Sequence, residues 1–212
     1  MQFTARTLRV AVRSPAAAIK LLQEQFRHPV AGDTPRSPQR PMFDAALRVH
    51  FRAGREVGAM VAEFDCRWSK AKRRESAAAT FANGRRMVEQ FVVLDAGSPD
   101  PLRVLEPPRT EQILGHDLRL THDLVYGALE GLVLRQLLTD SDMWRVEHLR
   151  LYALACLLHF EASSVAPLAR VEIWQLRMRK TLSWPRFLLL RQGPLLAERL
   201  DTVARAFEAD AA

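Results

Sequence analysis

Asp123 is the side chain in this sequence that best suits metal-dependent chemistry. It lies in the stretch from Leu118 to Tyr126, and Glu130 or Asp140 could join it. Carboxylates that meet at strand ends can hold Mg²⁺, which activates water and stabilises charge on a phosphate group. Trios of acids at such spacings occur in most chains of this size, so they do not by themselves predict catalysis.

Other catalytic and metal-binding patterns are absent from the sequence. It contains no G-x-S-x-G motif and no glycine-rich loop followed by GK[ST]. His148 and His159 lie eleven positions apart, on one face of a helix but too far apart to share a metal ion. Cys66 and Cys156 form no CxxC pair, which excludes a cysteine zinc site and a disulfide framework. No cofactor is predicted, apart from Mg²⁺ if the acids above form an active site.

A basic segment with one aromatic residue is the strongest candidate for a binding surface. The segment from Cys66 to Ser76, CRWSKAKRRES, surrounds a tryptophan with positive charge. The candidate nucleic-acid-binding residues are Arg67, Trp68, Lys70, Lys72, Arg73, Arg74, Arg85 and Arg86. Such cations can contact phosphates, and the ring can stack on a base. The alternative is a solvated turn between two helices.

The balance of charge favours an acidic partner. The chain has 31 Lys and Arg against 24 Asp and Glu, a formal net charge of +7, and clustered arginine is used mainly for phosphate contacts. No apolar run approaches the ~20 residues that a membrane-spanning helix needs, and the first residues have no long apolar core. We therefore expect a cytoplasmic protein that contacts nucleic acid and no membrane. Arginine-rich composition also occurs in basic proteins that bind no nucleic acid.

The elements that must position these residues begin with a helical N-terminal part. Residues Pro15–His28 have apolar side chains at helical spacing, with Ser14 as the predicted N-cap. The four prolines of Pro29–Pro41 exclude a helix or an inner strand there. We therefore divide the chain into a helix and proline-rich loop over 1–41 and a single α/β domain over 42–212.

Within that domain, strands gather in the middle and helices flank them. Helices are predicted over 42–65, 75–94, 143–160 and 194–208. Strands are predicted over 111–114 and 117–126, on either side of a Gly115–His116 turn, and over 129–138, 170–179 and 183–190. The predicted fold is α+β, with a mixed central β-sheet flanked by helices.

This order of elements resembles the RecB-like branch of the PD-(D/E)XK nucleases, which includes the CRISPR-associated RecB-like exonucleases. The matching segments are GREVG (54–58), LRLTHDLVY (118–126), LEGLVLRQLLT (129–139) and VEHLRLYALA (146–155). The resemblance covers about Phe51 to Lys180 and rests on order and spacing more than on identity. It implies a restriction-endonuclease-like fold, in which carboxylates at strand ends hold Mg²⁺ and a lysine positions the nucleophile.

The catalytic positions that the resemblance implies are only partly filled. Asp123 occupies the first acid position, and Tyr152 matches a tyrosine of the following helix. The second acid position is Gln136 and the lysine position is Leu138. A lone carboxylate beside a neutral amide, without an ammonium group, has too little charge to hold and use Mg²⁺. No catalytic residue is therefore predicted, and Asp123, Gln136 and Tyr152 are interpreted as remnants.

The sequence thus predicts a catalytically inactive nuclease-fold protein that binds nucleic acid, with DNA as the expected partner. The resemblance also implies other protein subunits, in a CRISPR, antiviral-defence or recombination complex. Candidate contacts to such subunits, unless they are ordinary core residues, are Trp68, Trp144, Trp174 and Trp184. The alternatives are an active Mg²⁺-dependent DNA nuclease, in which Glu130 or Asp140 joins Asp123, and a structural protein of a phage or other particle.

Overall fold

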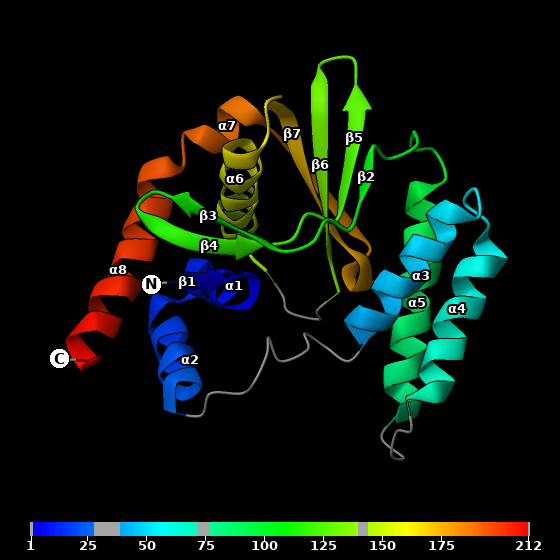
Figure 1. The fold of residues 1–212 in the computed structure, drawn as a ribbon, viewed down its shortest axis with the longest axis horizontal. Helices are drawn as coiled ribbons and strands as arrows, with labels where there is room; N and C mark the ends of the chain where they lie inside the picture. The colour runs from blue at the N-terminus through cyan, green and yellow to red at the C-terminus, as the bar shows by residue number, and fades with distance from the viewer. Residues whose placement is uncertain (1, 28–38, 72–76, 140–143, 212) are drawn as a thin grey trace.

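A computed structural model describes residues 2–27, 39–71, 77–139 and 144–211 (Figure 1). Its helices are α1 (Ala5–Arg13), α2 (Pro15–Arg27), α3 (Gln39–Arg52), α4 (Val57–Lys70), α5 (Ala77–Asp95), α6 (Val146–Ser163), α7 (Arg186–Leu190) and α8 (Gly193–Ala211). Its strands are β1 (Gln2–Thr4), β2 (Arg103–Val104), β3 (Arg109–Ile113), β4 (His116–Leu120), β5 (Leu124–Ala128), β6 (Gly131–Leu138), β7 (Leu168–Gln175) and β8 (Lys180–Pro185). The predicted α+β class is confirmed, with two mixed sheets among the described residues in place of one.

The larger sheet has the strand order β2-β5-β6-β7-β8. Its neighbours are antiparallel, except that β7 runs parallel to β6. The α6 helix makes the crossover that parallel neighbours require. Leu124 pairs with Arg135, and Leu138 pairs with Gln175. The start of β5, the end of β6 and the end of β7 therefore lie side by side.

The smaller sheet has the order β1-β4-β3, with β1 parallel to β4. Its β3–β4 hairpin confirms the predicted hairpin, but the turn lies one residue earlier than predicted, because His116 already pairs with Ile113. Leu114 and Gly115 both have positive φ, 52° and 82°, and two-residue hairpin loops of this kind need positive φ at both positions. Glycine meets that need without steric cost, which explains the position of Gly115.

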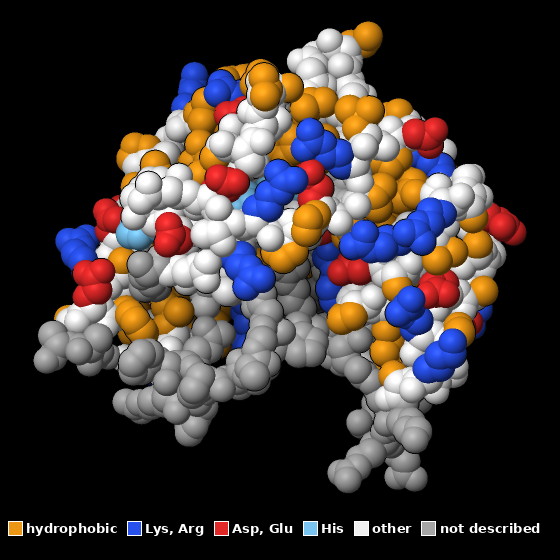
Figure 2. Space-filling view, viewed as in Figure 1, with side chains coloured by type: hydrophobic (Ala, Val, Ile, Leu, Met, Phe, Trp, Pro, Cys, Tyr) orange, Lys and Arg blue, Asp and Glu red, His pale blue; other side chains and the backbone are white. Residues whose placement is uncertain are grey.

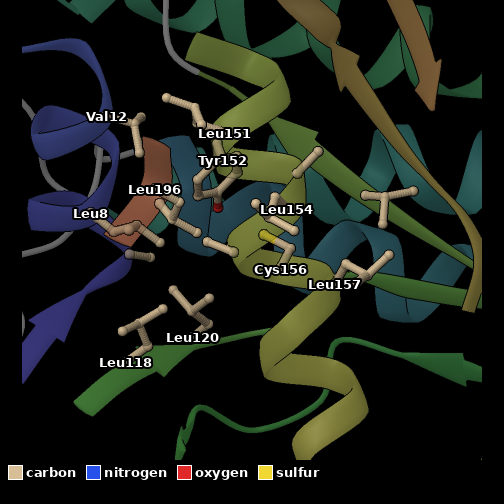
Figure 3. Packing of buried hydrophobic residues seen from close by; sticks show 14 of the residues in the cluster. Leu8, Val12, Leu118, Leu120, Leu151, Tyr152, Leu154, Cys156, Leu157 and Leu196 are labelled. Atoms are coloured by element: carbon tan, nitrogen blue, oxygen red, sulfur yellow. The ribbon is translucent and has the colours of Figure 1, made fainter. Parts of the chain in front are cut away.

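Two hydrophobic clusters pack against opposite faces of the larger sheet. Figure 1 shows α6 on one side of this sheet and α3, α4 and α5 on the other. One cluster joins α6 to α1, α2, α8 and the smaller sheet; Figure 3 shows Leu8, Leu118, Tyr152 and Leu196 of this cluster together. The other cluster joins α3, α4 and α5 to the sheet. The segment before α1 contributes Phe3, which is fully buried. Residues of the N-terminal part, which the sequence analysis separated from the α/β domain, therefore belong to the cluster around α6.

The single helix predicted over 42–65 is wrong, because α3 ends at Arg52 and α4 begins at Val57. Gly54 and Arg55 have φ of 66° and 67°, a left-handed conformation that ends a right-handed helix. The apolar stripe continues across the break because both helices contribute to the same cluster.

The single strand predicted over 117–126 is also wrong. The chain leaves the smaller sheet after Leu120 and enters the larger one at Leu124. Thr121, His122 and Asp123 make the crossing, and the last two are buried polar residues. Apolar residues continue on both sides of this crossing, which is why the sequence pattern did not reveal it.

Two other predicted boundaries are wrong. Helix α3 begins at Gln39, inside the segment 29–41 that was predicted to hold no helix, because a proline such as Pro41 is tolerated in the first turn of a helix. The strand predicted over 170–179 ends at Gln175, where a 3-10 helix over Leu176–Met178 follows.

Further differences lie nearer the two ends of the chain. The strand predicted over 183–190 is β8 followed by α7, because helix begins directly after Pro185. The elements β1 and α1 were not predicted. Thr4 caps α1, since its hydroxyl accepts a hydrogen bond from the N–H of Thr7 at 3.3 Å. Ser14 accepts from the N–H of Ala17 at 3.3 Å, as expected for the predicted cap of α2.

Candidate functional site

Asp123 lies directly before β5, where the chain enters the larger sheet. The pairing of Leu124 with Arg135 places it alongside the end of β6. The N–H of Leu137 donates to Asp123 Oδ2 at 2.7 Å, and the carboxylate is 4% exposed. The structure thus brings Asp123 next to the strand end that carries Gln136.

A buried arginine lies in front of the Asp123 carboxylate. Arg40, the second residue of α3, forms an ion pair with Asp123. It also donates to the carbonyl oxygen of Leu137 at 2.5 Å and to Asp44 Oδ1 at 2.6 Å. Burial disfavours the charge of Arg40, but the two carboxylates outweigh this effect and raise the pKa of Arg40. The guanidinium therefore stays charged throughout the physiological pH range.

The atoms around Arg40 are of the kind that bind hard cations. Carboxylate and backbone carbonyl oxygens are the preferred ligands of Mg²⁺ and Ca²⁺, and here three residues offer them to a guanidinium. The positive charge that a metal ion would supply next to Asp123 is thus supplied by the chain. In the described ranges, no group of three or more His, Cys, Asp or Glu side chains is arranged to hold a metal ion.

Gln136 begins a chain of hydrogen bonds on the other face of β6. Its Nε2 donates to the carbonyl oxygen of Thr121 at 3.0 Å and to His122 Nδ1 at 3.3 Å. His122 Nε2 lies 2.9 Å from His159 Nδ1, and His159 Nε2 lies 3.1 Å from the carbonyl oxygen of Arg109. Because a carbonyl oxygen can only accept, each neutral histidine carries its proton on Nε2. All these bonds then run in one direction, from Gln136 to Arg109.

His122 and His159, the two histidines in this series of hydrogen bonds, are neutral at physiological pH because their pKa values are lowered. Burial, then the proximity of His159 and of the arginines at 109 and 103, lowers the pKa of His122 to about 3. Burial also lowers the pKa of His159. A glutamate at position 136 would have no proton to donate to the Thr121 carbonyl when ionised. The amide of Gln136 therefore has a hydrogen-bonding role that an acid could not fill.

The remaining predicted remnant is Tyr152, and the lysine position of the resemblance is Leu138. Tyr152 and Leu138 belong to the α6 cluster, 5% and 3% exposed, and the Tyr152 ring centroid is 5.9 Å from that of Trp144. Glu130 lies in the β5–β6 turn, at the opposite end of β6 from Gln136, and pairs with Arg170. It therefore does not join Asp123. Asp140 lies outside the described residues.

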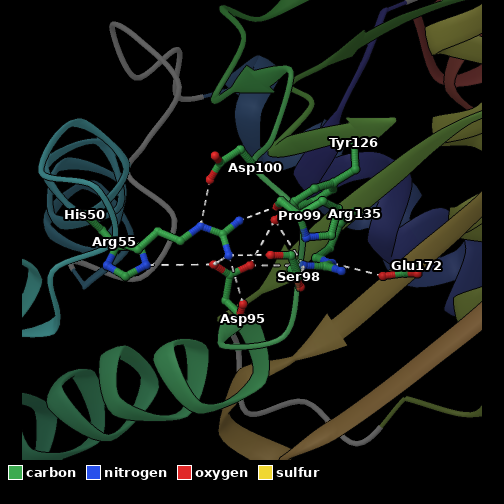
Figure 4. Close-up of polar contacts among 9 residues, drawn as sticks. All are labelled: His50, Arg55, Asp95, Ser98, Pro99, Asp100, Tyr126, Arg135 and Glu172. Carbon is green, nitrogen blue, oxygen red and sulfur yellow. Dashed lines mark hydrogen bonds and ion pairs between the residues drawn. The ribbon is translucent and has the colours of Figure 1, made fainter. Parts of the chain in front are cut away.

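A second buried charge network, which the sequence did not predict, connects the helical layer to the sheet (Figure 4). Asp95, at the end of α5, accepts from Arg135 at 3.2 Å and from the Tyr126 hydroxyl at 3.1 Å. Arg135 also donates to Glu172 at 2.9 Å, and its guanidinium carbon lies 3.6 Å from the ring centroid of Trp174. Because each charge in the network faces an opposite one, its role is structural.

The predicted basic segment is partly neutralised by acids of its own helices. Its exposed members among the described residues are Arg67, Lys70, Arg85 and Arg86. Arg67 lies 2.5 Å from Glu63, and Arg85 lies 3.7 Å from both Asp65 and Glu89. A cavity of about 490 Å³ between α3 and α4 is lined in part by Arg67. Lys72, Arg73 and Arg74 lie outside the described residues.

None of the four tryptophan side chains is fully exposed on the surface. Trp68 is half-buried, with its ring centroid 5.4 Å from Phe81 and 6.3 Å from Phe64. Three of the four predicted subunit contacts are instead core residues, 5–7% exposed: Trp144, Trp174 and Trp184. Their large apolar area is buried in the two clusters, as is usual for this side chain.

Another group of arginines lies beside β5, the strand that follows Asp123. The sequence analysis did not identify this group. Arg103 and Arg109 flank the loop between β2 and β3, and Arg48 reaches the same loop from α3. They are spread over about 60 positions and form no run of basic residues. Only the fold brings them together.

No helix in the described part of the chain is long and apolar enough to cross a bilayer.

A scan against protein-family models and a search of curated proteins gave no match to this chain.

Proposed function

We propose that this chain is a catalytically inactive nuclease-fold protein that binds nucleic acid, with DNA as the expected partner. The observation that carries the proposal is the guanidinium of Arg40, which lies against the Asp123 carboxylate and the Leu137 carbonyl oxygen. A nuclease of the resembling family would need a divalent cation beside this acid, with a second acid nearby. Here Arg40 neutralises the charge of the Asp123 carboxylate. The second acid position is Gln136, whose amide donates hydrogen bonds.

The order of the elements around the site supports the same proposal. Strands β5 and β6 form a hairpin, α6 crosses over, and β7 adds parallel to β6. The resemblance rests on this order of segments, although its segment 118–126 is divided between the two sheets. The net charge of +7 favours a polyanionic partner. We further propose that the chain works as one subunit of a larger nucleoprotein complex of the CRISPR, defence or recombination type.

Binding and cleavage can be tested with the purified protein. A fluorescently labelled DNA duplex of random sequence should bind, as measured by anisotropy, and binding should weaken steeply as salt rises. Gels after incubation with Mg²⁺ or Mn²⁺ should show intact DNA. Cleavage that disappears in Asp123→Ala would establish an active nuclease instead. Absence of binding at low salt, to DNA and RNA alike, would favour the structural-protein alternative.

A further inference from the structure

Arg103 and Arg109 share a single carboxylate. Glu106 Oε1 lies 3.0 Å from Arg103 Nη1 and 4.0 Å from Arg109 Nη2. The two arginine side chains are 45% and 49% exposed, while that of Glu106 is 14% exposed. Two guanidinium groups therefore face solvent around one largely covered acid, and this pair carries an excess of positive charge.

Arg48 adds a third cation to this surface from α3. Its Nη2 donates to the carbonyl oxygen of Leu105 at 3.3 Å, and the residue is exposed. The acceptor is neutral, so this contact positions the guanidinium without cancelling its charge. We call Arg48, Arg103 and Arg109 the arginine patch. Figure 2 shows Lys and Arg side chains along the middle of one face, over α3 and the strands beside it, with Asp and Glu side chains among them.

The loop between β2 and β3, which Arg103 and Arg109 flank, is held by buried contacts. The N–H of Leu105 donates to the carbonyl oxygen of Asp123 at 2.6 Å, and the N–H of Glu106 donates to that of His122 at 3.0 Å. Arg103 lies over the ring of Phe160, 5.7 Å from its centroid, and this ring is 1% exposed. Cations that are ordered before binding lose less conformational entropy on contact with a ligand.

The surroundings of the patch point to a duplex as the ligand. Single strands are held by exposed aromatic side chains on which bases stack, together with cations. Of the exposed large apolar side chains in the described residues, the aromatic one is Phe187, and it belongs to α7. Phe160 lies beneath Arg103 and offers no free face. The arginine patch therefore offers charge without a stacking surface.

We infer that the arginine patch contacts the phosphodiester backbone of double-stranded nucleic acid, independently of base sequence. This inference rests on the proposed function and names the surface that performs it. It places the contact at the β2–β3 loop and α3, whereas the sequence placed it on α4, α5 and the segment between them, of which 72–76 lie outside the described residues. The arginines at 67 and 85 each face an acid of their own helices, whereas two members of the patch share one acid.

Three charge variants of the full chain test the inference. The first carries Arg48→Gln, Arg103→Gln and Arg109→Gln. The control removes the same charge from exposed positions elsewhere, with Lys180→Gln, Arg191→Gln and Arg205→Gln. The third variant carries Arg67→Gln, Lys70→Gln, Arg85→Gln and Arg86→Gln. Thermal unfolding of each variant checks that its fold is intact before duplex binding is measured by anisotropy over a series of salt concentrations.

The patch variant should raise the Kd for the duplex about tenfold or more. It should also lower the magnitude of the slope of log Kd against log salt concentration by about two to three, since each lost phosphate contact removes roughly 0.9 from that slope. The control should change both much less. Glu106→Gln should act in the opposite direction and lower the Kd, because it removes the carboxylate that the two arginines share. Wild type should prefer a duplex to a single strand of equal length.

The outcomes separate the inference from the proposed function. If wild type binds a duplex but the patch variant keeps its Kd and slope, the inference is overturned and the proposed function stands. The same holds if only the α4–α5 variant loses binding, or if the single strand binds more tightly. If wild type binds no nucleic acid at low salt, the proposed function itself fails.

Discussion

Arg40 and Asp123 form an ion pair whose members are each almost fully removed from water, with side chains 6% and 4% exposed. Moving charges out of water is costly, and the cost is recovered only while the partners remain together. Asp44 and the Leu137 carbonyl oxygen complete the contacts of the guanidinium. Loss of Arg40 alone would leave Asp123 as an uncompensated buried charge.

Replacement of Arg40 should therefore destabilise the protein more than replacement of both partners. We expect Arg40→Met to lower the free energy of unfolding by about 3–5 kcal/mol, the usual cost of breaking a buried pair. The double variant Arg40→Met/Asp123→Asn should recover part of this loss, because the unpaired charge is gone while the contact from the Leu137 N–H can remain. Urea unfolding of the wild type and of these variants measures the difference. A double variant less stable than Arg40→Met would contradict this account.

The neutral His122 makes stability depend on pH. Its pKa falls from 6.5 in the unfolded chain to about 3 in the fold, mainly through burial, so the unfolded state takes up a proton first as pH falls. The free energy of unfolding should then decrease between pH 6.5 and about 3, by up to about 1.4 kcal/mol per pH unit for this histidine. Urea unfolding between pH 8 and pH 4.5 measures the slope. His122→Asn should give a shallower slope, and equal slopes would rule out His122 as the source.

At the scale of elements, the close approach of α4 and α5 depends on Gly84. A Cβ atom at this position would overlap the ring of Phe64, whose two Cε atoms would lie 3.2 and 3.3 Å from it. The Phe64 ring is fully buried and has little room to move, because it stacks near Phe81 and Trp68. The glycine thus sets the distance between the two helices.

Substitution of two helical glycines should have opposite effects on stability. Gly84→Ala should lower the free energy of unfolding by about 1–3 kcal/mol, through overpacking of the α4–α5 contact. Gly58→Ala, in exposed α4, should raise it by about 0.5–1 kcal/mol, because alanine favours the helix and its Cβ would meet no atom closer than Glu56 Oε1 at 3.8 Å. Thermal unfolding of the two variants tests the signs. A neutral Gly84→Ala would show that the helices can separate without cost.

At the scale of the whole molecule, the larger sheet separates two hydrophobic clusters and is shared by both. Arg135 of β6 reaches Asp95 of α5 and Glu172 of β7, so buried charges join the helical layer to the sheet. The N-terminal segment adds a strand to the smaller sheet and packs α1 against α6 and α8. The proposed duplex-binding surface crosses from α3 to the loop between β2 and β3, at the edge of the larger sheet.

Local patterns predicted the elements that depend on neighbouring residues. Apolar spacing indicated α2, α5, α6 and α8, and the Gly115 turn indicated the β3–β4 hairpin. The break between α3 and α4 escaped this reasoning because Arg55 adopts a left-handed conformation that its residue type does not suggest. The two-sheet arrangement escaped it because Leu120 and Leu124 look like one apolar strand, although they belong to different sheets.

By itself, the sequence determined the α+β class, the excess of positive charge and the isolation of Asp123 as a carboxylate without a second acid at position 136. The tertiary structure decided what stabilises that carboxylate. Arg40 lies 83 positions away in the sequence, and no periodicity or motif links residues that meet only through packing. The same applies to the pairing of His122 with His159 and to the assembly of the arginine patch. Spacing along the chain reports local structure, whereas charge compensation in a buried site depends on which distant residues the core brings together.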